Sequence, residues 1–284
     1  MIEGLWLVLR AAGLMLSFQA AGAALFMVLF KQQLAGAAPA IGKLGSRVGF
    51  AALAVLAAQV LLEPVYLAGE WSGAVDADTL RLFAGSPTAA TLALRLSGMA
   101  GIAFGLRRPV RFQGLPVAGC LALLISFTLS GHTSVHAHRP ALAVLLLFHL
   151  GIVAFWFGAL WPLRQVIALE PCVVAARVIT AFSGVAVKLV PLIAVAGACM
   201  AALLLPDLGA LLQPYGLLML GKVALFAILL GLAGLNRLRF TPALASETAQ
   251  AARGLRHSIA IEYLLICATL ALSAVMTGMF SPEP

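Results

Sequence analysis

Charged residues are scarce in this sequence: Asp, Glu, Lys and Arg make up 10% of its 284 residues, while 63% are hydrophobic. A soluble domain carries about a quarter charged residues and is about half apolar. Apolar runs of roughly 20 residues, the length that crosses the hydrocarbon core of a bilayer, fill most of the chain. The composition therefore excludes a large soluble domain and predicts an all-α, polytopic helix bundle in a membrane.

Motifs that couple transport to nucleotide hydrolysis, or that form cysteine metal gates, are also absent. The sequence has no Walker loop, no GxGxxG segment, no DKTG-type aspartate and no CxxC or CPC motif. These absences argue against an ATP-driven pump. The four cysteines are scattered, and three of them lie in apolar runs, where a free cysteine behaves as a small hydrophobic residue. Disulfides are therefore not expected.

Basic residues outnumber acidic ones, 18 against 10, and the formal net charge is +8. The apolar runs predict about eight spans, near residues 4–30, 48–69, 88–106, 114–131, 140–163, 178–205, 215–235 and 257–279. The loops after the odd-numbered spans hold twelve of the 18 basic residues: Lys31, Lys43, Arg47, Arg107, Arg108, Arg111, Arg164, Arg177, Arg237, Arg239, Arg253 and Arg256. Because cytoplasmic loops concentrate Lys and Arg, we expect both termini in the periplasm of a bacterial inner (cytoplasmic) membrane. The same rule explains the positive charge without a nucleic-acid partner.

Three other segments carry simple expectations. The first apolar run is too long for a signal-peptide core and lacks a suitably placed cleavage site, so we expect a retained span. Residues 70–86 are mixed in polarity and predict a short interfacial helix over the outer mouth of the bundle. Residues 236–256 are basic and are expected to lie along anionic headgroups.

The segment "SGHTSVHAHRP" holds three of the five histidines, His132, His136 and His138, and His149 follows in the next apolar run. A His-x-His loop is a common metal-binding arrangement because neutral imidazole binds copper, zinc, nickel and iron. Near the end of the last span, Met276 and Met279 share a helix face on the same predicted side, and thioethers favour Cu(I). The pattern predicts a copper site, as Cu(I) or Cu(II). The alternative is a polar turn, a hydrogen-bonded core histidine and two packing methionines.

Ionisable residues inside the predicted spans form a second set of candidates, because such groups are costly in a membrane and normally face a cavity or a partner. We expect Glu63 to pair with Arg95 or Lys222, and the charges in the outer half to converge below the histidine turn. For Arg10 and Glu262 the favoured interpretation is an ion pair that locks helices together. The full set is Arg10, Glu63, Arg95, His149, Lys188, Lys222 and Glu262.

Several stretches resemble the CopD/PcoD family of bacterial copper-resistance membrane proteins. They are "GHTSVHAH" followed by "FHLGIVAFWFGALWPL", then "AFSGVAVKLVPLIAVAGA", "YGLLMLGKVALFAILLGLAGLNRLRFTPAL" and "LRHSIAIEYLLICATLALSAVMTG". The resemblance implies a single transmembrane domain over residues 1–284 and is strongest over residues 114–284. It also implies a copper-handling protein with about eight helices, beside a periplasmic CopC-like partner that is expected to be a separate protein.

Matching positions carry family roles only by this resemblance. His132, His149 and Trp156 match the family pattern, and Lys222, Asn236 and Arg237 match as structural or gating residues. His136 and His138 fall in a more variable loop, so their role depends on the His-x-His argument alone.

We therefore expect a copper permease that takes copper from the periplasmic face. Copper would bind at the histidine turn and pass to His149 with help from Met276 and Met279, while Glu63, Arg95 and Lys222 set the charge of the cavity or relay protons. The main rival is a membrane oxidoreductase with copper or b-type haem, linked to quinol. His149 has no obvious buried histidine partner, which counts against haem. A copper sensor or assembly protein without transport is a third alternative.

Overall fold

The chain folds as a bundle of antiparallel helices in a computed structural model, which describes residues 1–107, 114–131, 136–205, 207, 209–244 and 249–280. No β-strand occurs in these residues, and the all-α prediction is confirmed. The α-helices are α1 (Ile2–Phe30), α2 (Ala38–Ala68), α3 (Ala77–Ala84), α4 (Pro87–Arg107), α5 (Leu115–Ser126), α7 (Arg139–Leu169), α8 (Cys172–Leu204), α9 (Pro214–Leu235), α10 (Thr241–Leu244) and α11 (Ala249–Met279).

Seven helices of the described chain are long and apolar enough to cross a membrane: α1, α2, α4, α7, α8, α9 and α11. The protein is thus a multi-pass membrane protein. The predicted fourth span corresponds to α5, which has 12 residues and rises only about 18 Å at 1.5 Å per residue. Residues 127–131, predicted as the end of this span, form turns and bends instead.

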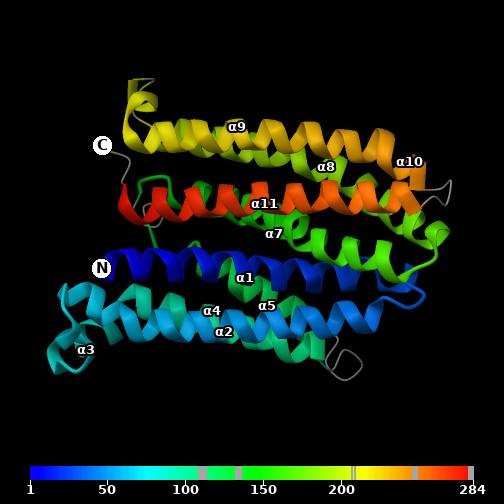
Figure 1. Ribbon diagram of the computed structural model, residues 1–284. Helices are drawn as coiled ribbons and strands as arrows, with labels where there is room; N and C mark the ends of the chain where they lie inside the picture. The colour runs from blue at the N-terminus through cyan, green and yellow to red at the C-terminus, as the bar shows by residue number, and fades with distance from the viewer. Residues whose placement is uncertain (108–113, 132–135, 206, 208, 245–248, 281–284) are drawn as a thin grey trace.

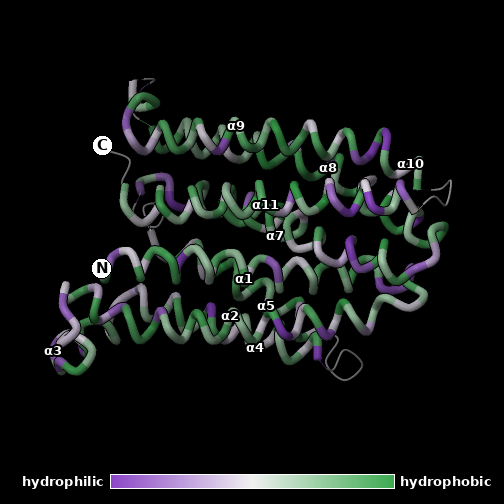
Figure 2. Tube along the Cα trace, in the orientation of Figure 1, coloured by the Kyte–Doolittle hydropathy of each residue, from purple (hydrophilic) through white to green (hydrophobic). Residues whose placement is uncertain are grey.

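The helices alternate in direction, so the bundle has two distinct ends (Figure 1). We call the end where α1 begins and α11 finishes the outer end, and the opposite end the inner end. Helix α3 lies at the outer end, and α10 lies at the inner end. Hydrophilic residues gather toward the ends, and the middle of the bundle is predominantly hydrophobic (Figure 2).

Several helices extend beyond the predicted spans at the inner end. Helix α2 begins at Ala38 rather than residue 48, α8 at Cys172 rather than 178, and α11 at Ala249 rather than 257. Hydropathy locates only the part of a helix that matches the hydrocarbon core, whereas the helical hydrogen bonds continue through the basic residues beyond it. Much of the segment predicted to lie along headgroups, residues 236–256, is therefore part of helical structure.

The short helix predicted within residues 70–86 is confirmed: a 3₁₀ turn, Trp71–Ala74, is followed by α3. The Asp76 carboxylate caps α3 by accepting hydrogen bonds from the Thr79 hydroxyl at 2.6 Å and the Thr79 backbone N–H at 2.8 Å. These hydrogen bonds hold the pKa of Asp76 below its ordinary value.

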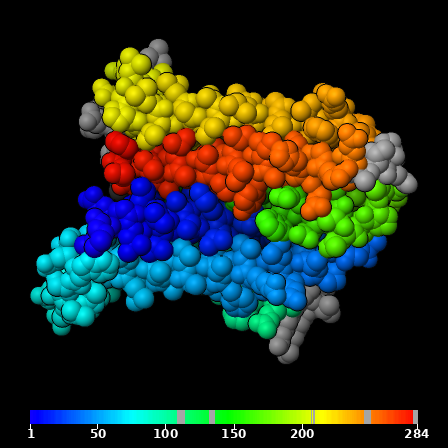
Figure 3. Space-filling model, viewed as in Figure 1, coloured from blue at the N-terminus to red at the C-terminus, as the bar shows by residue number. Residues whose placement is uncertain are grey.

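Helix α1 is the centre of the packing, with contacts to α2, α7 and α11. On the face shown in Figure 3, α1 lies between α11 and α2. Its closest approach is to α7, where a Cβ on Gly22 would lie 2.1 Å from the Ala154 carbonyl oxygen and 2.4 Å from Gly158 Cα. The Gln19 amide donates to the Gly158 carbonyl at 3.0 Å. Small residues thus let two backbones touch, as is typical of transmembrane helix pairs.

A buried carboxylate joins two helix junctions at the inner end. Glu170, between α7 and α8, accepts through Oε1 from the backbone N–H groups of Ala35, Gly36 and Ala37 at 3.0, 2.8 and 2.7 Å. These donors lie immediately before α2, at the end where the helix dipole favours a negative charge. Glu170 therefore ties the junction between α7 and α8 to the junction between α1 and α2.

Candidate functional site

A cavity of about 350 Å³ opens among the helices toward the outer end. Its walls come from α1, α2, α4, α7, α8, α9 and α11, together with the turn after α5. Three charged side chains line it, Arg10, Glu63 and Arg95, and so do Ser130 and Gly131 from the turn that precedes the histidines. Of the outer charges predicted to converge below that turn, Arg10, Glu63 and Arg95 line this cavity, whereas His149 and Lys222 do not.

Within this cavity Glu63 has a different partner from the one expected. Its Oε2 accepts a hydrogen bond from the Trp6 indole N–H at 2.9 Å, and Trp6 stacks on Tyr66 with ring centroids 4.4 Å apart. Arg95 donates from Nε to the Ser126 hydroxyl at 3.2 Å and lies 4.0 Å from the centre of the Phe127 ring. The predicted ion pair of Glu63 with Arg95 or Lys222 is therefore wrong, because in the described residues the indole holds the carboxylate and Lys222 lies elsewhere.

Arg10, the other guanidinium of the cavity, is also without an ion pair in the described chain. It donates from Nη2 to the Thr277 hydroxyl at 3.1 Å and lies 4.9 Å from the Trp6 ring centre. The helix-locking role expected of Arg10 is thus carried by a hydrogen bond between α1 and α11 rather than by an ion pair.

The histidine turn leads into α7 at the outer end. The rings of His136 and His138 have centroids 5.6 Å apart, and the His138 backbone N–H donates to His136 Nδ1 at 3.1 Å. Because Nδ1 accepts this hydrogen bond, the neutral His136 ring carries its hydrogen on Nε2, and a metal would have to replace that hydrogen bond at Nδ1 or bind after a change of tautomer. His132 lies outside the described residues. Among those described, no group of three or more His, Cys, Asp and Glu side chains is placed to hold a metal ion.

His149 lies eleven residues after His138 on α7, about 16 Å along the helix axis. Its Nδ1 is 3.3 Å from the Ile193 carbonyl oxygen on α8. Because a carbonyl only accepts, Nδ1 carries the hydrogen and Nε2 keeps a lone pair, as in metal-bound histidines whose second nitrogen is hydrogen-bonded. His149 is also close enough to Lys222 for an electrostatic interaction. On α7 the cavity is lined by Leu146 and Leu150, so His149 faces α8 rather than the cavity.

The two candidate methionines differ in environment. Met276 is 7% exposed, whereas Met279 is 59% exposed. Spacing of three residues puts them on neighbouring positions of α11, but the end of the helix leaves Met279 outside the packed bundle. Of these two methionines, only Met276 is therefore packed among the helices that surround the cavity.

A second polar cluster lies in the inner half of the bundle. Glu262 is 3% exposed, and its Oε1 accepts from the Asn236 side-chain amide at 2.6 Å. The Trp156 side chain also hydrogen-bonds to Glu262. Asn236 begins a π-helical turn, Asn236–Phe240, at the end of α9. Glu262 thus locks α7, α9 and α11 together through neutral donors in the described chain, and the expected ion pair is wrong.

Nearby, Arg237 donates from Nη1 to the carbonyl and the hydroxyl of Ser183, both at 2.9 Å. It therefore ties the end of α9 to α8. Asn236 and Arg237, matched by resemblance as structural or gating residues, have structural contacts here. Sequence reasoning missed both the Asn236–Glu262 bond and the Trp6–Glu63 bond, because partners 26 and 57 residues apart leave no local signal.

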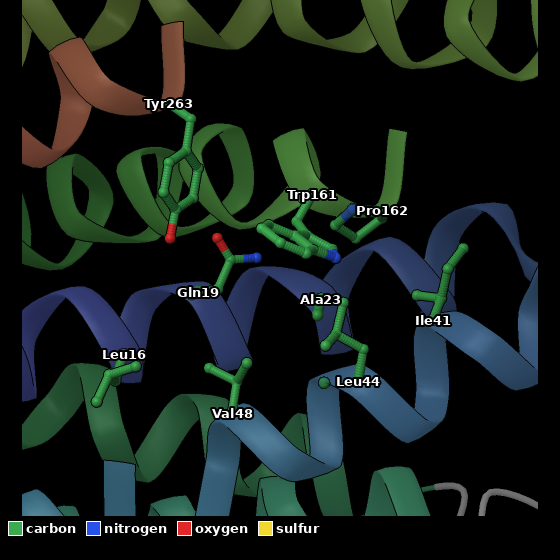
Figure 4. Close-up of a pocket in the computed structure, with 10 residues that line it drawn as sticks. Leu16, Gln19, Ala23, Ile41, Leu44, Val48, Trp161, Pro162 and Tyr263 are labelled. Atoms are coloured by element: carbon green, nitrogen blue, oxygen red, sulfur yellow. The ribbon is translucent and has the colours of Figure 1, made fainter. Parts of the chain in front are cut away.

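A smaller cavity of about 110 Å³ lies among α1, α2, α7 and α11 (Figure 4). Gln19 and Tyr263 point toward one another across it, with Trp161 beside them. The remaining walls are apolar or glycine, and no His, Cys, Met or acidic residue lines it. This cavity lacks the ligands that copper requires.

Comparison with known proteins shows which family part of the chain resembles. Residues 176–276 match the family model described as "Copper resistance protein D", CopD. This part of the chain is similar to the CopD family. A curated "Copper resistance protein D" from Pseudomonas syringae pv. tomato is 32% identical over 150 residues, which cover 48% of this chain and 48% of that protein. The chain therefore matches about half the length of its curated CopD relative, and no solved structure matches it.

The CopD match confirms the resemblance over residues 176–276. The matched residues run from α8 to near the end of α11. They include Lys222, the Asn236–Glu262 pair and Met276. The histidine turn, His149 and the charged residues of the outer cavity precede the matched CopD region.

Proposed function

We propose that this protein is a copper permease of the bacterial inner membrane that takes copper from the periplasmic face. The CopD match carries the copper assignment. The position of the His136–His138 pair supports an outer entry point, because the pair follows Ser130 and Gly131, which line the outer cavity.

In this proposal the imidazoles of His136 and His138, together with His132, capture copper at the outer end. Imidazole nitrogen is a good ligand for copper, and the free Nε2 of His149 offers a second position deeper in the bundle. Met276 supplies a thioether suited to Cu(I) on the neighbouring helix. A separate CopC-like periplasmic protein would deliver the metal.

Lys222 lies near His149, whereas Arg95 lines the outer cavity, so the two residues have separate roles. Lys222 lies close enough to His149 to set the charge at that position or to relay a proton there. Glu63, Arg10 and Arg95 fix the charge of the outer cavity. Trp156 acts on the inner side, where it helps to hold Glu262.

Metal analysis and an optical spectrum of the purified protein, with and without added copper, test this proposal. Wild type should bind copper, and the variant His136→Ala/His138→Ala should lose most of it. His257→Ala is the matched control, because His257 is an exposed histidine near the inner end. Copper retained in the double variant would contradict the entry site, and a Soret band would favour the membrane oxidoreductase instead.

A further inference from the structure

The outer cavity carries more positive than negative charge. Its described lining has two guanidiniums, Arg10 and Arg95, and one carboxylate, Glu63. The Glu63 carboxylate is engaged by the Trp6 indole, and neither arginine forms an ion pair in the described part of the chain. Arg10 lies close enough to interact electrostatically with both Glu63 and Arg95, so the described lining keeps a net positive charge. A bare copper cation entering this space would be repelled.

Both arginines lie well below the outer end of the bundle. Each is eight residues from the first residue of its helix, Ile2 of α1 or Pro87 of α4, which places it about 12 Å along the axis. A charged side chain at membrane depth is costly unless it faces a cavity or a partner. Two such groups in one cavity indicate that the partner is a ligand.

Hydrogen-bond donors remain free for this ligand. A guanidinium has five N–H donors, and the bonds described above use only Nε of Arg95 and Nη2 of Arg10. Thr91 lines the same cavity, and its hydroxyl is buried at the cavity wall with no hydrogen-bond partner in the described chain. The volume of about 350 Å³ lies within the range of small-molecule pockets.

We propose that the outer cavity binds a small anion bearing carboxylate or phosphate groups, held by Arg10, Arg95 and Thr91. Guanidiniums recognise both groups through paired N–H donors. The extension of this inference to transport rests on the proposed function. In that extension, copper occupies the cavity as a complex with such an anion rather than as a bare ion. Anion binding itself requires no copper and can be measured alone.

The test uses the purified full chain in nanodiscs of zwitterionic lipid, without copper, titrated calorimetrically with citrate and with inorganic phosphate. Wild type should bind at least one probe with a saturable isotherm. Arg95→Gln should weaken that binding about tenfold or more, because a charge-assisted bond is lost. Arg81→Gln is the matched control: Arg81 is an exposed arginine of α3 at the outer end, paired with Asp78 at 3.2 Å. It should bind as wild type does.

A folding defect is separated from a binding defect by Arg95→Lys, which keeps the positive charge and should retain part of the affinity. A second set of nanodiscs contains anionic phospholipid. If citrate binds wild type more weakly in these nanodiscs than in zwitterionic ones, the anion site is supported and a lipid headgroup is a further source of its ligand. Absence of saturable binding of both probes to folded wild type, or equal weakening by Arg81→Gln, would overturn the proposal.

The outcomes for copper and for the anion are independent. Loss of copper from the His136→Ala/His138→Ala variant with citrate binding intact would leave both proposals standing. Loss of citrate binding in Arg95→Gln with copper still bound at the histidines would support two separate sites. Copper retained in the double-histidine variant would contradict only the copper entry site.

Discussion

The outer cavity and the inner polar cluster use the same kinds of residue in opposite ways. In the cavity, Arg10 and Arg95 face open space without an ion pair in the described chain. In the inner cluster, Glu262 is buried and accepts hydrogen bonds from Asn236 and Trp156. Polar groups that hold helices together are enclosed by protein, whereas polar groups that bind a ligand keep free donors toward a cavity.

The family match separates the same two regions. Asn236 and Glu262 lie within residues 176–276, whereas the histidine turn and the arginines of the cavity precede that range. The CopD match therefore supports the inner framework directly. The ligand chemistry of the outer end has to be established on this chain itself.

The largest expected effect comes from the contact between α1 and α7. Gly158→Leu would force a side chain against Gly22 Cα, which lies too close to accommodate even a Cβ at position 158. Overpacking of backbone against backbone should destabilise the bundle by about 3 kcal/mol or more. Fluorescence-detected gel filtration and thermal unfolding in detergent measure this loss. Gly231→Leu, at an exposed glycine with no atom within 4 Å of its Cβ position, should leave the elution profile unchanged.

The next effect concerns the carboxylate at the inner end. Glu170→Ala would leave the N–H groups of Ala35, Gly36 and Ala37 without their acceptor. Leaving buried donors unpaired should reduce the free energy of unfolding by about 2–3 kcal/mol. Denaturation of the purified variant checks the value. Glu70→Ala, which removes an exposed carboxylate whose described bond is to Ser72, should differ little from wild type.

A smaller loss is expected in the inner cluster. Glu262→Ala removes the acceptor of Asn236 and Trp156 and should cost about 1–3 kcal/mol of stability. Glu262→Gln keeps an oxygen acceptor and should cost less than Glu262→Ala. Both variants should bind citrate as wild type does, because Glu262 does not line the outer cavity. Weakened citrate binding in a folded Glu262→Gln protein would break the separation of the two regions.

The smallest expected effect concerns the net charge of the outer cavity. Glu63→Gln removes the one carboxylate in the described lining while keeping an oxygen that accepts from Trp6. The affinity for the anion should rise by a few-fold, because one exposed or half-buried charge changes the binding free energy by about 1 kcal/mol or less. Calorimetric titration with citrate measures the change. Weaker binding in this variant would show that Glu63 positions the ligand rather than repelling it.

The sequence predicts the class of the fold and most helices because hydropathy reports directly on the membrane. It does not predict the inner ends of α2, α8 and α11, where helical hydrogen bonds continue beyond the apolar core. It places Arg10, Glu63 and Arg95 at similar depth, since helical rise converts residue number into depth. The rotation of each helix is set by packing, which sequence spacing does not encode. For that reason the Trp6 partner of Glu63 and the α8-facing orientation of His149 became apparent only in the structure.

Copper uptake into proteoliposomes tests the central claim most directly. Wild type, His136→Ala/His138→Ala and His257→Ala would be reconstituted at equal density, and copper inside the vesicles would be measured after external copper is added and then removed. The account predicts uptake by wild type and by His257→Ala, and uptake near the protein-free background for the double variant. Copper bound to the wild-type protein without accumulation in the vesicles, or equal uptake by the double variant, would contradict it.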